Sequence, residues 1–193
     1  MILDQKKYRF NLKTITLSRV ITTLLAMVSI SAHSQSNIKH DMSARALSVS
    51  APWEITSLDP AKNGYIFTRL EIAETLVNVT NAGELTGGLA TSWVTTDSIN
   101  WRLKLRPKAK FHDGSAVTAE ATVKSLERAL TQPGVLRNAS VKKISAVSGE
   151  VMIELNKPLT ALPAFLAHNS TQILAAASYA ADGTVSAVIG SGP

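Results

Sequence analysis

The sequence predicts a mixed α/β (α+β) fold, and three observations support this prediction. Apolar residues alternate with polar or charged ones over 101–106 and again over 151–156, which is the period of half-buried strands. Residues 118–130 instead place their apolar side chains on one helical face. Hydrophobic residues make up 45% of the 193 residues and charged ones 18%, a globular composition. Because strands and helices follow no regular βαβ order, a simple parallel sheet is not expected.

Each predicted strand has a turn signal beside it. A first strand is expected over 46–51, and a short one over 77–80 is followed by the turn composition Asn-Ala-Gly-Glu. We expect two hairpins. One pairs 93–95 with 101–106 across Asp97-Ser98, and the other pairs 143–147 with 151–156 across Ser148-Gly149.

The helices are predicted from apolar spacing and capping residues. A loop is expected over 52–64, with a turn at Lys62-Asn63-Gly64. A helix is expected to follow, whose face carries Ile66, Leu70, Ala73 and Val77 and which ends near 76. Thr118 is the expected N-cap of the helix 118–130, which Pro133-Gly134 ends. A short helix over 162–167 and a strand over 172–176 follow. Residues 185–189 approach a further strand, and the closing Gly-Ser-Gly-Pro suggests a chain cut off after 193.

The first 34 residues have the layout of a cleaved secretory signal peptide. Five basic residues precede an uncharged stretch over 20–32, and small residues suited to cleavage after Ser34 or Ser36 follow. The stretch is shorter than the roughly 20 apolar residues that a membrane-spanning helix needs. Residues 35–45 are expected to be flexible. Without the leader, fifteen basic and thirteen acidic residues remain, too small an excess to indicate binding of polyanions.

Several classes of function are excluded by what the sequence lacks. There is no cysteine, which excludes disulfides, thiolate metal sites, cysteine nucleophiles and a lipid-anchor cysteine. No nucleophile elbow, phosphate-binding loop or dinucleotide fingerprint occurs, and the four histidines are scattered. His112 is expected to be a loop residue before an Asp113-Gly114 turn. We therefore predict no enzyme, no metal site and no cofactor.

A series of short motifs resembles one protein family. In order along the chain these are LDPA (58–61), AETLV (73–77), GLATSW (88–93), LRP (105–107), KFHDG (110–114), VTAE (117–120) and SLERAL (125–130), before the closing GSGP. Their order and spacing are similar to those of the family 5 solute-binding proteins of ABC importers, which include oligopeptide-, dipeptide- and nickel-binding proteins. The resemblance covers essentially all of 46–193.

The resemblance implies a type II periplasmic-binding-protein fold of two lobes, of which only the first would be present. This first lobe would consist of a core part, 46–75 and 185–193, and an inserted subdomain, 76–184. The implied function is that of a periplasmic substrate-binding component, which binds peptides or a nickel or other metal–chelator complex and delivers it to membrane permease subunits. The alternatives are a periplasmic sensor or chaperone on the same fold, or a periplasmic hydrolase. No nucleic-acid partner and no membrane span in the mature protein are expected.

Candidate ligand contacts come from two places. Ligands of open α/β sheets lie beyond the carboxyl ends of the strands, which points to the loop and helix start after the first strand. A helix start also favours an anion such as a carboxylate. Tyr65 and Arg69 are the polar candidates there, with Asn63 and Gly64 as backbone contributors. The resemblance to nickel binders adds Arg137.

Overall fold

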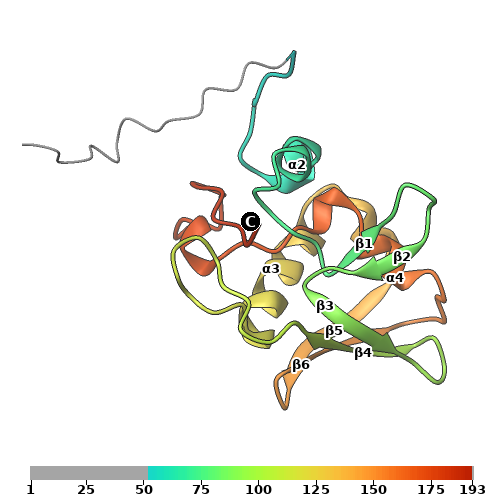
Figure 1. The fold of residues 1–193 in the computed structure, drawn as a ribbon. Helices are drawn as coiled ribbons and strands as arrows, with labels where there is room; N and C mark the ends of the chain where they lie inside the picture. The colour runs from blue at the N-terminus through green and yellow to red at the C-terminus, as the bar shows by residue number, and fades with distance from the viewer. Residues whose placement is uncertain (1–51, 193) are drawn as a thin grey trace, which may run out of the picture. The chain divides into compact units, whose positions relative to one another are not determined.

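The computed structural model describes residues 52–192, which contain a four-stranded antiparallel sheet, a separate two-stranded hairpin and two longer helices (Figure 1). The sheet has the order β3-β4-β6-β5, and β1 pairs with β2. The strands are β1 (Val77–Val79), β2 (Leu85–Gly87), β3 (Ala90–Val94), β4 (Asn100–Leu105), β5 (Val141–Val147) and β6 (Glu150–Leu155). The α-helices are α2 (Pro60–Arg69), α3 (Ala119–Thr131) and α4 (Leu162–Phe165), and the 3-10 helices are η2 (Val135–Ala139), η3 (Asn169–Thr171) and η4 (Ala176–Ser178).

Both predicted hairpins of the sheet are confirmed. Trp93 of β3 lies opposite Leu103 of β4, and Ile144 of β5 lies opposite Ile153 of β6. The second hairpin turns at Ser148-Gly149, where both residues have positive φ, 50° and 79°. The alternation in the sequence arises because one face of the sheet is buried under α3, which packs on β5 and β6.

Helix α3 begins and ends where the sequence predicts. The side chain of Thr118 accepts a hydrogen bond from the Ala121 N–H at 3.2 Å, as an N-cap does. Leu126 is fully buried in the main core, to which Val123 also belongs. The helix ends at Thr131, two residues before Pro133.

The helix predicted over 66–76 is placed wrongly, because α2 covers 60–69. Asp59 caps it by accepting a hydrogen bond from the Ala61 N–H at 2.9 Å, and Pro60 takes the first helical position. The Lys62-Asn63-Gly64 sequence is therefore helical and not a turn. Glu71 follows with φ of 54° and stops the helix, so the buried Ala73 and Val77 lie outside it.

The predicted strand 172–176 is also wrong, although its backbone is buried. The Ile173 N–H donates to the Glu74 carbonyl and the Ala175 N–H to the Ile189 carbonyl, each at 2.9 Å. These acceptors belong to two different segments, so no ladder forms, and η4 begins at Ala176. Residues 185–189 likewise form no strand beyond a single bridge at Val185. The short helix predicted from 162 is confirmed as α4.

A partly buried ion pair joins α2 to α3. The Arg128 guanidinium contacts the Asp59 carboxylate at 3.1 Å and donates through Nε to the Gly183 carbonyl at 2.6 Å. Tyr179 lies nearby and forms a 3.0 Å hydrogen bond with the Ser125 hydroxyl. Burial raises the pKa of the Tyr179 phenol. Asp59 thus caps α2 and ties it to α3 at the same time.

Some predictions concern residues beyond the described part. The signal peptide 1–34, the flexible 35–45, the strand 46–51 and Pro193 lie outside the described residues. Between residues 52 and 192, no helix combines the length and the apolar composition needed to cross a membrane.

Candidate functional site

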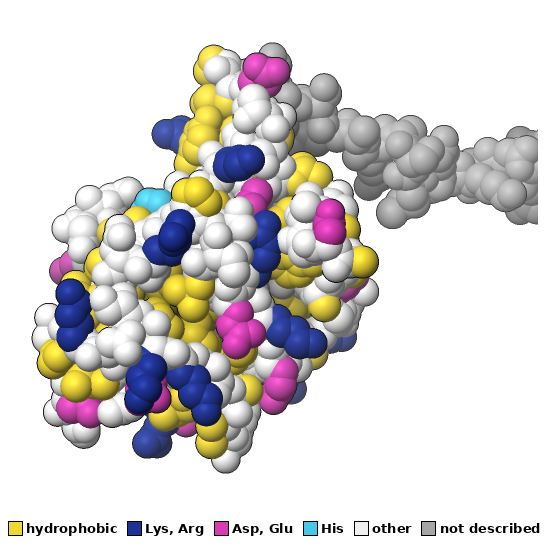
Figure 2. Space-filling view, turned by 180° about the vertical axis from the view of Figure 1, so that it is seen from behind, with side chains coloured by type: hydrophobic (Ala, Val, Ile, Leu, Met, Phe, Trp, Pro, Cys, Tyr) yellow, Lys and Arg dark blue, Asp and Glu magenta, His cyan; other side chains and the backbone are white. Residues whose placement is uncertain are grey.

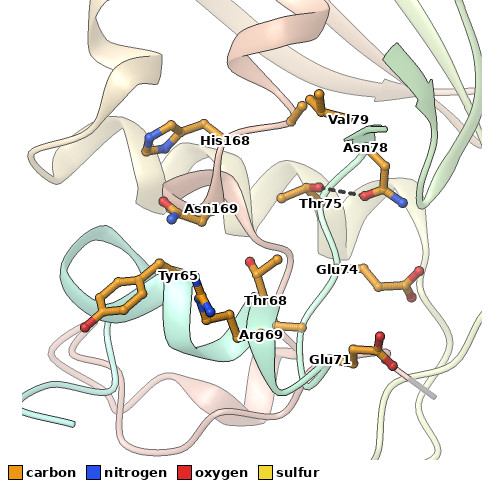
Figure 3. A pocket seen from close by; sticks show the side chains of 12 residues that line it. Tyr65, Thr68, Arg69, Glu71, Glu74, Thr75, Asn78, Val79, His168 and Asn169 are labelled. Carbon is orange, nitrogen blue, oxygen red and sulfur yellow. Dashed lines mark hydrogen bonds between the residues drawn. The ribbon is translucent and has the colours of Figure 1, made fainter. Parts of the chain in front are cut away.

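An open cavity of about 800 Å³ lies between α2, the chain that follows it, and the segment before η3. Its polar side chains come from two stretches that are far apart in sequence, 65–79 and 167–169, and Figure 3 shows His168 and Asn169 across from α2. The lining residues are Tyr65, Thr68, Arg69, Glu71, Ala73, Glu74, Thr75, Asn78, Val79, Ala167, His168 and Asn169. Its polar groups offer both hydrogen-bond donors and acceptors.

Helix α2 supplies the first wall. Tyr65, Thr68 and Arg69 are three and four residues apart, so they share one helical face. The opposite face of the helix buries Ile66 and Phe67, so the side chains of the first wall point away from the core. The Arg69 guanidinium lies 5.6 Å from the centre of the Trp53 ring, which is a cation–π contact. Because the ring is neutral, this contact does not balance the charge of Arg69.

His168 and Asn169 supply the second wall. The Nδ1 atom of His168 accepts a hydrogen bond from the Ser170 N–H at 3.1 Å. This bond assigns the proton of the neutral ring to Nε2, which leaves a donor on the exposed edge of the imidazole. The same bond caps η3, so the wall is held by its own local hydrogen bonds.

The Glu74 carboxylate also lines the cavity, but other residues of the protein already bind it. Arg106 binds it through two hydrogen bonds of 2.9 and 2.7 Å, and the Ser191 hydroxyl donates to it at 2.9 Å. The hydrogen bonds that Arg106 donates to Glu74 raise the pKa of its guanidinium. The charge of Glu74 is therefore balanced within the protein. Arg69 and Glu71 make no ion pair with any other described residue.

The segment 190–192 packs against the residues that follow α2. His112 holds it at two points, because its N–H donates to the Gly190 carbonyl and its Nε2 bonds the Gly192 carbonyl, both at 2.9 Å. The Gly192 N–H donates to the Ile72 carbonyl at 3.2 Å. A Cβ at Gly190 would lie 2.7 Å from the Ala73 Cα, so the backbones touch. His112 is a loop residue before a Gly114 with φ of 82°, as predicted.

The structure brings together two of the five predicted contacts. Tyr65 and Arg69 line the cavity, whereas Asn63 and Gly64 lie on the buried side of α2. Asn63 accepts a hydrogen bond from Thr56, and Gly64 packs on Asn169. Arg137 is exposed on η2 and does not line the cavity.

The sequence prediction missed Thr68, Glu71, His168 and Asn169 as lining residues. Thr68 could have been found from its spacing to Tyr65 if 60–69 had been predicted as the helix. His168 and Asn169 carry no local signal, because only the tertiary fold brings them to α2.

The charge of the described surface is mixed. Figure 2 shows basic and acidic side chains interspersed on one face, with apolar side chains between them. Within 52–192, no three histidine or acidic side chains are grouped so that they could hold a metal ion.

Comparison with known proteins agrees with this architecture. The family model of the bacterial extracellular solute-binding proteins, family 5, matches residues 84–193. The periplasmic murein peptide-binding protein MppA of Escherichia coli K12 is 41% identical over 86 residues, which are 43% of this chain and 16% of that protein.

Solved structures that are 33–34% identical to this chain share the fold. The nickel ABC transporter protein of Bacillus halodurans superposes with a TM-score of 0.63 at 34% identity, covering 71% of this chain and 29% of that one. The AgaA binding protein of A. tumefaciens R10, solved with agropinic acid, gives a TM-score of 0.63 at 33% identity, with 72% and 30% covered.

The described residues therefore form part of a type II periplasmic-binding-protein fold. The chain belongs to the bacterial extracellular solute-binding proteins of family 5. It spans less than a third of the length of each of these relatives.

Proposed function

We propose that this chain is part of the substrate-binding component of an ABC importer, and that it holds a peptide or a metal–chelator complex for delivery to permease subunits. The observation that carries the proposal is the open cavity, in which Arg69 presents a guanidinium without an acidic partner among the described residues. Peptides and chelators both carry carboxylates, which a guanidinium binds through paired hydrogen bonds.

Several other polar groups of the cavity suit the carboxylates of such a ligand. Tyr65 and Thr68 add hydroxyl groups, and the Nε2–H of His168 adds a donor on the opposite wall. Glu74 stays bound to Arg106, so its carboxylate does not repel an anion as a free one would. Asn63 and Gly64 support the ligand only indirectly, by holding α2 in place. Arg137 is proposed as a contact of a ligand that extends to η2.

The lobe division is a further part of the proposal. We place the core part at 46–75 and 185–193 and the inserted subdomain at 76–184. The backbone contact between 190–192 and 71–74 supports it, because it joins the two segments of the core part across the inserted residues. In this arrangement the cavity lies where the core part and the subdomain meet.

Titration calorimetry of the full chain tests the proposal, with murein tripeptide and a nickel–histidine complex as probes. Binding of at least one probe is expected. The R69A variant should bind about tenfold more weakly, because it loses a charge-assisted hydrogen bond to the ligand carboxylate. K62A is the matched control, since Lys62 is an exposed cation on α2 that does not line the cavity.

Unchanged binding by R69A would remove Arg69 from the site, and no binding of any probe by the wild-type chain would contradict the proposed function. R137A is tested in the same titration. An unchanged dissociation constant for that variant would remove Arg137 from the ligand contacts.

We also propose that the protein is exported to the periplasm after cleavage of residues 1–34 or 1–36. N-terminal sequencing of the periplasmic fraction should give a mature protein that starts at Gln35 or Asn37. An intact Met1 in the membrane fraction would contradict this.

A further inference from the structure

The two walls of the cavity meet at a residue that does not line it. Gly64 lies on the buried side of α2, and its Cα packs on the main chain of Asn169. A Cβ at this position would lie 2.9 Å from the Asn169 carbonyl carbon and nearer still to its oxygen. Because Asn169 belongs to the second wall, α2 and that wall are in direct backbone contact.

A buried amide joins the same elements. Gln172 is 3% exposed, and its Nε2 lies 2.8 Å from the Thr68 hydroxyl, 3.1 Å from the Gly64 carbonyl and 3.2 Å from the Ala73 carbonyl. Thr68 and Ala73 line the cavity, whereas Gln172 does not. Its Oε1 is buried without a partner among residues 52–192, so the side chain is held through its amino group alone.

The chemistry of this position requires a donor. The three atoms around Nε2 are all oxygens, and glutamine is the side chain of this length that can donate two hydrogens to them while staying neutral. Glutamate would place a charged acceptor among three neutral acceptors, and methionine would fill the space but leave the oxygens without this donor.

We propose that Gln172 is a positioning residue for ligand binding, which sets the separation between the α2 wall and the His168–Asn169 wall. It acts through Gly64, Thr68 and Ala73 and does not touch the ligand. This role rests on the proposed function, since it concerns the geometry of the same cavity. The geometry itself can be measured without a ligand.

The experiment compares the Q172M and Q132M variants of the full chain. Gln132 is the matched control, because it is partly exposed and its Nε2 bonds only Thr131 of the same helix end. Amide hydrogen exchange is followed by mass spectrometry over 60–74 and over 150–155, and murein tripeptide binding is measured by calorimetry. Q172M should speed exchange over 60–74 by about tenfold and weaken binding by a similar factor, while 150–155 keeps its rate.

Unchanged exchange over 60–74 in Q172M, or an equal rise over both segments, would overturn the proposal, because the second result indicates general destabilisation. If Q172M does not fold, T68V replaces it, since Thr68 is exposed and supplies the shortest of the three bonds. Exchange alone is then scored, and a rise limited to 60–74 supports the role while no rise contradicts it. If the wild-type chain binds no tripeptide, the exchange result alone decides whether Gln172 positions the two walls. The proposed function and the role of Gln172 can therefore fail separately.

Discussion

Alanine at Gly190 should lower the free energy of unfolding by about 3 kcal/mol, the upper part of the range for forced overpacking. The added Cβ would lie 2.7 Å from the Ala73 Cα and 2.9 Å from its Cβ, and closer to the Ile72 carbonyl oxygen. Backbone atoms cannot turn aside as the end of a flexible side chain can. The segment 190–192 must therefore lift away from 71–74, which breaks the Gly192–Ile72 and Ser191–Glu74 hydrogen bonds. Urea denaturation measures the loss.

Gly83 provides the control for this substitution. It has a φ of 84° and nothing within 4 Å of an added Cβ, so alanine there is strained but meets no atom. A cost of about 1 kcal/mol is expected for that conformation. A G190A variant no less stable than G83A would show that 190–192 does not pack on 71–74.

Alanine at Asp59 is expected to cost about 2 kcal/mol, the sum of a lost N-cap and a lost partner for a partly buried arginine. Asp59 caps α2 through the Ala61 N–H, and its second carboxylate oxygen lies 3.1 Å from Arg128. The side chains of Arg128 and Asp59 are only 21% and 15% exposed, so solvent screens this ion pair less than the others. The midpoint of urea denaturation reports the change.

Asparagine at the same position separates the two contributions. Asparagine caps helices about as well as aspartate but carries no charge, so D59N should cost about 1 kcal/mol. Equal losses for D59A and D59N would show that the cap contributes nothing. No loss in either variant would contradict the placement of α2 between Asp59 and Arg69.

The strands and helices that the sequence predicts correctly are those whose residue pattern reflects local structure. The hairpins were predicted because alternation along one strand reflects one buried face, as at Trp101 and Leu103. Helix α3 was predicted because Thr118 and the apolar stripe agree. Helix α2 was misplaced because Gly64 suggested a turn, whereas its missing side chain serves the contact with Asn169.

The candidate site was predictable only on the side of α2. Tyr65 and Arg69 follow from a helix beside the expected ligand position, and both line the cavity. His168 and Asn169 reach it through packing between segments about a hundred residues apart. The pairing of Glu74 with Arg106 likewise depends on the fold, because the two residues are 32 apart in the sequence.

The long sequence separations within the site determine when it can form during synthesis. The Gln172–Gly64 bond joins residues 108 apart, and the Ser191–Glu74 bond joins residues 117 apart. The β3–β4 hairpin instead joins Thr91 to Lys104, only 13 residues along. A chain leaving the ribosome can therefore pair these strands early, whereas α2 has no second wall until residue 169 has emerged. Until then the nascent chain leaves Ile66, Phe67 and the backbone at Gly64 uncovered, so the apolar face of this helix is exposed to other proteins for most of synthesis.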